Sequence, residues 1–135
     1  MKKLYVITRN DLPISQQATQ SIHAAVDLVF KHHIELKNWH DLSNTIVLLS
    51  VANEKQLIKL SKKLKTSKIK HTIFTEPDIG DQITALALEP SDDAAGFCKE
   101  LSTALKPPNK GGLKETEINK LDEQFRELKQ MILYK

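Results

Sequence analysis

Residues 10–30 read NDLPISQQATQSIHAAVDLVF, and this stretch decides the fold. It follows a short apolar run at residues 4–7, and Pro13 suits a turn or the first turn of a helix because its φ angle is fixed. Apolar side chains then recur at steps of three and four residues, at Ile14, Ala18, Ile22, Ala25, Val26 and Val29. This spacing predicts a long helix with one apolar stripe that faces the core.

A second stripe on the same helix is polar and consists of Gln16, Gln20, His23 and Asp27. Their spacings of four, three and four residues put these side chains next to one another on the helix surface. The stripe begins where the helix follows the end of a strand, and ligands tend to bind at this place in open α/β sheets. It is therefore a candidate site, although such a stripe can also be no more than the solvated face of an amphipathic helix.

Length and composition are those of one ordinary domain. The chain has 135 residues, and its formal net charge of +3 permits a polyanionic partner without requiring one. A single cysteine, Cys98, cannot form an internal disulfide, and we expect it to pack in the interior in a reducing compartment. We see no signal peptide and no run near the roughly 20 apolar residues that a membrane helix needs, so we expect a cytoplasmic protein.

The remaining pattern predicts an α/β fold of three layers, in which helices flank a mixed four-stranded sheet. We expect strands at residues 3–8, 45–51, 69–75 and 83–88, with helices starting at Asn53 and Ser91. The strand–helix–strand unit at 45–75 implies a right-handed crossover and parallel pairing, and the last strand is expected to be antiparallel to the third. We interpret residues 35–44 as a polar connection in which Trp39 covers the edge of the core.

The composition changes after residue 106, where prolines and glycines predict a linker. We therefore divide the chain into a domain at 1–106, a linker at 107–114 and an amphipathic C-terminal helix at 115–135. The apolar stripe of that helix is Ile118, Leu121, Phe125, Leu128 and Ile132. The stripe could fold back on the body, pair with a second copy in a homodimer, or bind another partner; we favour the first two.

Several polar residues are candidates for a catalytic site, although the sequence lacks the common phosphate-binding, zinc-binding and serine-hydrolase motifs. The sequence has no Gly-rich phosphate loop, no zinc-spaced Cys/His set and no G-x-S-x-G elbow. An acidic turn at residues 76–82 could meet the start of the first helix at one end of the sheet. The candidate groups are then His23, Gln16 and Gln20 on the helix, Glu76, Asp78 and Asp81 in the turn, and Thr84 on the last strand. A histidine or carboxylate can hold or deprotonate a water, and amides can stabilise charge on a carbonyl, which is a minimal set for metal-free ester hydrolysis.

Several segments together resemble one known family. Residues 9–12 (RNDL) and 18–25 (ATQSIHAA) are similar to the opening of type II peptidyl-tRNA hydrolases, the kind typical of archaea and eukaryotes. That opening reads R-x-D-L after an apolar strand, then a Gly-Lys pair, then A-A-Q-x-x-H-A. The resemblance continues through residues 45–51, 53–57 (NEKQL) and 84–90 (TALALEP), and it covers roughly residues 3–105 in the right order.

The resemblance implies a hydrolase, often dimeric, that cleaves the ester between a peptide and its tRNA without an organic cofactor. His23, Gln20 and Thr84 match the family's histidine, glutamine and threonine. The family's Gly-Lys pair falls on Ser15-Gln16, so the lysine thought to help catalysis is absent, and either Glu76 or Asp78 stands for the family's aspartate. The chain therefore resembles a divergent branch of the family.

The partner expected from the resemblance is tRNA or peptidyl-tRNA, with no membrane. The lysines at Lys55, Lys59, Lys62 and Lys63 could contact its phosphates, or could simply form a solvated helix face. Two functions follow. One is hydrolysis of peptidyl-tRNA or a related acylated RNA; the other is a catalytically inactive RNA- or protein-binding module on the same fold.

Overall fold

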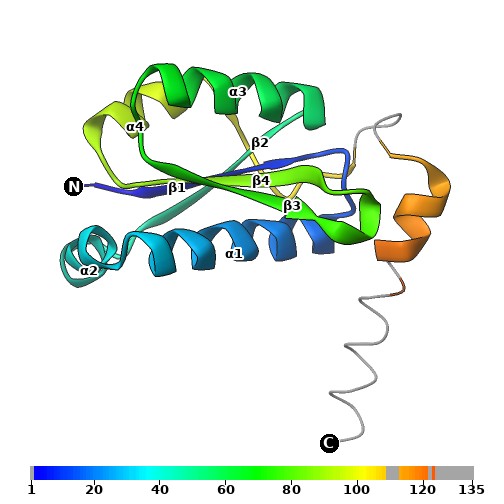
Figure 1. Ribbon diagram of the computed structural model, residues 1–135, viewed down its shortest axis with the longest axis horizontal. Helices are drawn as coiled ribbons and strands as arrows, with labels where there is room; N and C mark the ends of the chain where they lie inside the picture. The colour runs from blue at the N-terminus through cyan, green and yellow to red at the C-terminus, as the bar shows by residue number, and fades with distance from the viewer. Residues whose placement is uncertain (1, 109–112, 122, 124–135) are drawn as a thin grey trace, which may run out of the picture.

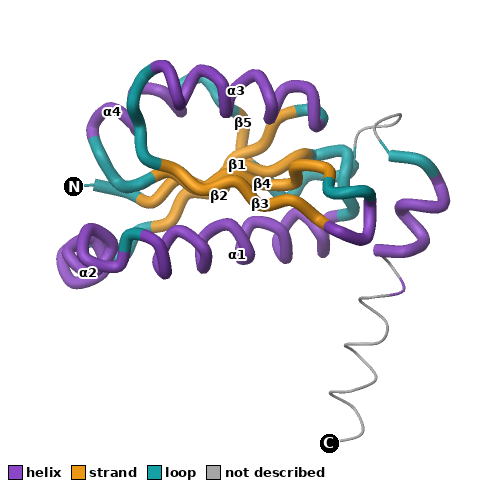
Figure 2. Tube along the Cα trace, in the orientation of Figure 1, coloured by secondary structure: helices purple, strands orange, loops and turns teal. Residues whose placement is uncertain are grey.

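A computed structural model describes residues 2–108, 113–121 and 123, which form a three-layer α/β fold (Figure 1). The strands of its sheet are β1 (Leu4–Arg9), β2 (Ile46–Val51), β3 (His71–Glu76), β4 (Gln82–Leu88) and β5 (Ser102–Thr103). The helices are α1 (Ile14–Lys31), α2 (His33–Leu42), α3 (Glu54–Thr66) and α4 (Asp92–Cys98), and a short 3₁₀ helix, η1 (Pro77–Ile79), joins β3 to β4. Figure 2 shows the sheet in the middle layer, with helices on both sides.

The sheet has five strands in the order β3-β4-β1-β2-β5, and it is mixed, as predicted. All four predicted strands are present, whereas the fifth was missed because the two residues of β5 carry no periodicity. The predicted pairing of the 69–75 strand with the 45–51 strand is wrong: β4 and β1 lie between β3 and β2. The short turn between β3 and β4 instead makes them antiparallel neighbours, and that part of the prediction is confirmed.

Two apolar clusters pack on opposite faces of the sheet. One includes Leu57 and Leu64 of α3 and Ala94 of α4, and the other includes Ala24 and Leu28 of α1. Both predicted helix starts are capped as expected, because the Gln56 amide N–H donates to Asn53 and the Ala94 amide N–H donates to Ser91. The central strands are thus covered on both sides.

The predicted polar connection at residues 35–44 is wrong, because most of it belongs to helix α2. Trp39 on this helix is buried beside Leu36, and its indole Nε1–H donates to the Thr45 carbonyl at 3.0 Å. The interpretation of Trp39 as a cover for the core edge is confirmed.

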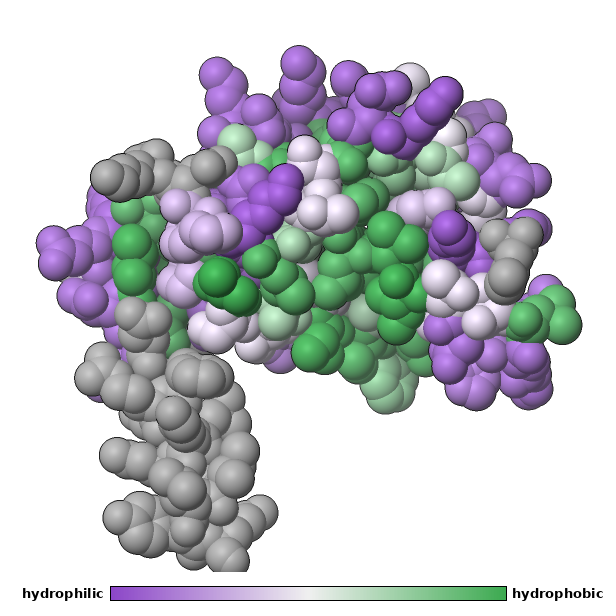
Figure 3. All heavy atoms as spheres, turned by 180° about the vertical axis from the view of Figure 1, so that it is seen from behind, coloured by the Kyte–Doolittle hydropathy of each residue, from purple (hydrophilic) through white to green (hydrophobic). Residues whose placement is uncertain are grey.

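Helix α1 turns the opposite face to the sheet from the one predicted. Its buried residues are Gln16, Gln17, Gln20, Ser21, Ala24 and Leu28. The expected core stripe faces outward instead, and Ile22 is 62% exposed. Figure 3 shows hydrophobic side chains gathered on the rear of the molecule. The apolar spacing identified the helix correctly but assigned its inner face wrongly.

The C-terminal helix is described in part. Residues 115–121 are helical, and Leu121 is buried against Leu12 and Ile79. The predicted stripe residues Phe125, Leu128 and Ile132 lie outside the described residues. The pairing of this helix with a second copy stays a prediction.

Candidate active site

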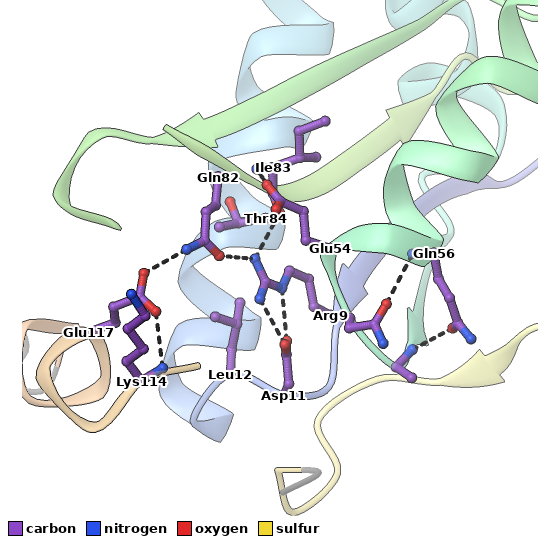
Figure 4. Close-up of polar contacts among 12 residues, drawn as sticks. Arg9, Asp11, Leu12, Glu54, Gln56, Gln82, Ile83, Thr84, Lys114 and Glu117 are labelled. Carbon is purple, nitrogen blue, oxygen red and sulfur yellow. Dashed lines mark hydrogen bonds and ion pairs between the residues drawn. The ribbon is translucent and has the colours of Figure 1, made fainter. Parts of the chain in front are cut away.

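A buried ion pair marks the end of β1. The Arg9 guanidinium donates from Nε and Nη2 to the two carboxylate oxygens of Asp11 at 2.8 and 2.7 Å, and both side chains are 1% exposed (Figure 4). Such a two-point contact fixes the loop that leads from β1 into α1. Arg9 Nη1 also donates to the side-chain oxygen of Gln82 at 2.8 Å, so the loop is tied to the start of β4.

The start of β4 receives further contacts from both sides. Gln82 Nε2 donates to a carboxylate oxygen of Glu117 at 2.6 Å, and the Ile83 amide N–H donates to Glu54 at 2.8 Å. Glu54 is the first residue of α3, and Glu117 belongs to the helical residues 115–121. Four segments therefore meet where β1 ends and β4 begins.

A bulge in β4 directs Thr84 toward α1. Phe74 is opposite Ala85 and Thr75 is opposite Ile83, so Thr84 is an extra residue with no partner on β3. Ala85 packs in the apolar cluster between the sheet and α1. Because of the bulge, the Thr84 side chain points to the same face of the sheet as Ala85. Its carbonyl also accepts from the Thr8 hydroxyl at 2.8 Å.

The candidate cluster consists of Gln16, Gln20, Glu76 and Thr84. The Thr84 hydroxyl donates to Gln20 Oε1 at 2.6 Å. Gln20 Nε2 donates to Gln16 Oε1 at 3.1 Å and to Glu76 Oε2 at 3.2 Å. The central Gln20 amide thus uses both its oxygen and its nitrogen, and its orientation is fixed by three partners.

All four members of the cluster are buried. Gln16, Gln20, Glu76 and Thr84 are exposed by 3, 1, 7 and 0%, respectively. Within the part of the chain that the structure describes, no lysine, arginine or histidine forms an ion pair with Glu76. Its carboxylate is instead hydrogen-bonded by the Gln20 amide and, at 3.4 Å, by the Asp78 backbone N–H.

His23 lies outside this cluster on the exposed side of α1. Its ring stacks on Phe74 of β3, with centroids 4.5 Å apart and planes 9° from parallel. Because Phe74 and Glu76 are two residues apart on one strand, both face α1. His23 therefore sits at the solvent edge of the face that holds the cluster, next to β3.

The remaining predicted residues lie farther from the cluster. The Asp78 side chain is half-buried, and Asp81 is exposed and adopts a left-handed φ of 58°. Asp27, one turn beyond His23 on α1, is half-buried. The lysines all lie exposed on α3, which covers the other side of the sheet from α1; they are Lys55, Lys59, Lys62 and Lys63.

Sequence reasoning missed several residues that organise this end of the sheet. Arg9 and Asp11 were noted as part of a motif, but not as a buried pair. A charged residue directly after an apolar strand, with an opposite charge two positions on, was the available signal. Gln17 was missed too: its amide donates to the Leu12 and Lys106 carbonyls and its oxygen accepts from the Leu105 N–H. Glu117 gave no signal, because its partner is 35 residues away.

Cys98 does not supply a nucleophile to this region. It is buried in the cluster under α3 and α4, and burial raises the pKa of its thiol to about 12. Among the described residues, no group of three or more His, Cys, Asp or Glu side chains is arranged to hold a metal ion. No helix of the described part combines the length and apolarity needed to cross a membrane.

Comparison with known proteins adds one finding. The family model of peptidyl-tRNA hydrolase PTH2 matches residues 2–103, which include β1 through β5 and every member of the cluster. No curated protein matches the chain. The helical residues 115–121 lie beyond the matched part.

Proposed function

Because the chain belongs to the peptidyl-tRNA hydrolase PTH2 family, we propose that it hydrolyses the ester bond of peptidyl-tRNA, or of a related acylated RNA, at the buried cluster. The observation that carries the proposal is the chain of hydrogen bonds from Thr84 through Gln20 to Glu76, at 2.6 and 3.2 Å. A carboxylate, a hydroxyl and two amides converge there within the matched part of the chain. The proposed location of the reaction is the cytoplasm.

The chemistry requires water to attack the carbonyl carbon of the ester. A tetrahedral intermediate forms, the bond from that carbon to the ribose oxygen breaks, and a proton passes to the ribose oxygen. Glu76 is the proposed acceptor of the proton from water, with Asp78 as the second candidate, and Gln16, Gln20 and Thr84 hold the carbonyl and the ribose. His23 at the solvent edge positions water or the end of the RNA.

The neutral side chain of Gln16 should make ester hydrolysis slower than in a protein with a lysine at this position. An amide can donate a hydrogen bond to a developing oxyanion but carries no charge, so it stabilises that oxyanion less than the family's lysine would. The variant Gln16→Lys would place an amine close to Glu76, because Gln20 hydrogen-bonds to both positions in the wild type. We expect it to hydrolyse peptidyl-tRNA faster than the wild type, and an unchanged rate would argue against a charge requirement at this position.

The direct test is release of peptide from an N-blocked aminoacyl-tRNA at low salt. Glu76→Gln keeps the size of the side chain and removes its charge, so we expect a loss of about a hundredfold or more. Asp78→Asn tests the second candidate acid, and Asp81→Asn is the matched control, because Asp81 is exposed in the same turn. Full activity of both Glu76→Gln and His23→Ala would overturn the site assignment.

The second candidate function is a binding module without turnover. It is favoured by the burial of all four members of the cluster and by the amide at position 16 in place of the lysine. Binding of deacylated tRNA without peptide release in the wild type would support it.

RNA binding is proposed to use the α3 lysines. Neutralised phosphates make binding depend on salt, because bound counterions are released. Changing Lys55, Lys59, Lys62 and Lys63 to glutamine should weaken tRNA binding at low salt and flatten its salt dependence. An unchanged salt slope, measured by fluorescence anisotropy, would mean that these lysines are only a solvated face.

A further inference from the structure

A segment outside the family match contacts Gln16 of the cluster. Residues 113–121, called the strap below, contact the body at two polar points. Gln16 Nε2 donates to the Leu121 carbonyl at 3.3 Å, and Gln82 Nε2 donates to Glu117 at 2.6 Å. Figure 4 shows the Gln82 amide between Glu117 of the strap and Arg9 of β1.

The strap is also anchored by one apolar side chain. Leu121 is fully buried against Leu12 and Ile79, with Leu113 at the margin of this small cluster. Leu12 belongs to the loop before α1, and Ile79 belongs to η1, which follows Glu76. The strap thus bridges the two segments that border the cluster, one on each side.

Most of the strap makes no such contacts. Its exposed residues are Lys114, Glu115, Thr116, Asn119 and Lys120. Its attachment rests on the Leu121 side chain and two side-chain hydrogen bonds, whereas each central strand is fixed by a ladder of backbone bonds. A segment held by so few contacts opens at a lower free energy than the sheet it covers.

The closed strap conflicts with access of a large substrate. An ester must come within about 3 Å of the groups that act on it. Gln16 donates one of its two side-chain N–H groups to the Leu121 carbonyl, and the other members of the cluster are buried. Because Gln16 is only 3% exposed, an incoming acylated RNA end cannot reach it while Leu121 stays docked.

We propose that the strap is an autoinhibitory element: its docking through Leu121 and Glu117 closes the cluster, and the acylated end of the RNA enters only when the strap leaves. The inhibition of hydrolysis by the strap rests on the proposed hydrolytic site. The control of access to Gln16 by the strap can be tested without turnover.

The first test measures access directly in the full chain. Gln16→Cys introduces a thiol and removes the bond from Gln16 to the Leu121 carbonyl, so that Glu117 and the Leu121 side chain still hold the strap. Modification of the thiol by a maleimide is followed by mass spectrometry. Adding Leu121→Asp should speed that modification by roughly tenfold or more, because the strap opens. Glu117→Ala, which removes the bond to Gln82, gives a milder second opening variant, and Lys120→Asp is the matched control on the exposed side of the strap. Far-UV circular dichroism verifies that the body stays folded.

The second test measures peptide release with the same strap variants on otherwise wild-type protein. Faster release by Leu121→Asp and Glu117→Ala, but not by Lys120→Asp, supports the strap as an inhibitor of the site. Equal labelling of Gln16→Cys with the wild-type strap sequence and with Leu121→Asp overturns the inference, whatever the activity. Faster labelling with no release in any variant supports strap control and overturns the hydrolase proposal instead.

Discussion

Helix α1 has a polar face against the sheet and an apolar face toward the outside, which is the reverse of an ordinary amphipathic helix. The face against the sheet carries the glutamines at positions 16, 17 and 20, and the outward face carries Ile22, Val26 and Val29. Burial of an amide is tolerable only when its polar atoms find partners, and Gln17 and Gln20 each hydrogen-bond through both oxygen and nitrogen. The inner face is thus built for specific polar contacts rather than for maximal apolar burial.

This difference shows that specific polar contacts, and not apolar spacing alone, decide which face of α1 meets the sheet. A helix with leucines at positions 16 and 20 would bury more apolar surface, but it would leave Glu76 and Thr84 without the partners they have now. The polar inner face of α1 therefore follows from the hydrogen-bonded cluster beneath it.

The largest expected contrast is in thiol chemistry. Ile22→Cys places a thiol on the outward face, whereas the resident Cys98 is buried with its pKa raised from 9.0 to about 12. At pH 8 the thiolate fractions should differ by about a thousandfold, because the thiolate is the reactive form. Maleimide labelling resolved by mass spectrometry should show this ratio. Comparable rates at both positions would mean that position 22 is covered in solution.

The next contrast concerns apolar contacts on neighbouring positions. Leu28 is fully buried, whereas Val29 is 41% exposed. Leu28→Ala should lower the free energy of unfolding by about 2–5 kcal/mol, because it leaves a cavity in the core. Val29→Ala, the control, should cost less than about 1 kcal/mol. Urea unfolding measures both, and equal losses would contradict the orientation of α1.

The smallest expected difference is in the free energy of unfolding when a polar residue of the inner face and an apolar residue of the outer face are each replaced by the opposite type. Gln20→Leu should cost about 1–3 kcal/mol, since Thr84 and the Glu76 carboxylate lose a buried partner. The reverse change on the outer face, Ile22→Gln, should stay within about 0.5 kcal/mol. If Gln20→Leu instead stabilised the protein, the inner face would not depend on its amide network.

Local signals in the sequence predicted most of the fold. Apolar runs located four strands, and Asn53 and Ser91 marked the helix starts because caps act within one turn. Signals that depend on distant partners failed. The placement of β4 and β1 between β3 and β2, and the inward rotation of Gln20, are set by contacts with residues far along the chain.

The candidate site could be predicted in part. The family-like motif pointed to Gln20 and Thr84, and the structure brings both together with Gln16 and Glu76. Its burial was not predictable, because the polar stripe suggested a solvated face. The contribution of Glu117 was equally out of reach, since it depends on how the chain after residue 112 packs on the body.

The most direct test of the central claim compares two threonines in single-turnover release of peptide from peptidyl-tRNA. Thr84→Val removes the hydroxyl that donates to Gln20, whereas Thr19→Val removes a hydroxyl that donates to the Ser15 carbonyl within α1. If the cluster under α1 is the hydrolytic site, Thr84→Val should lose about a hundredfold in rate while Thr19→Val keeps the wild-type rate. Wild-type rates in both folded variants would contradict that claim.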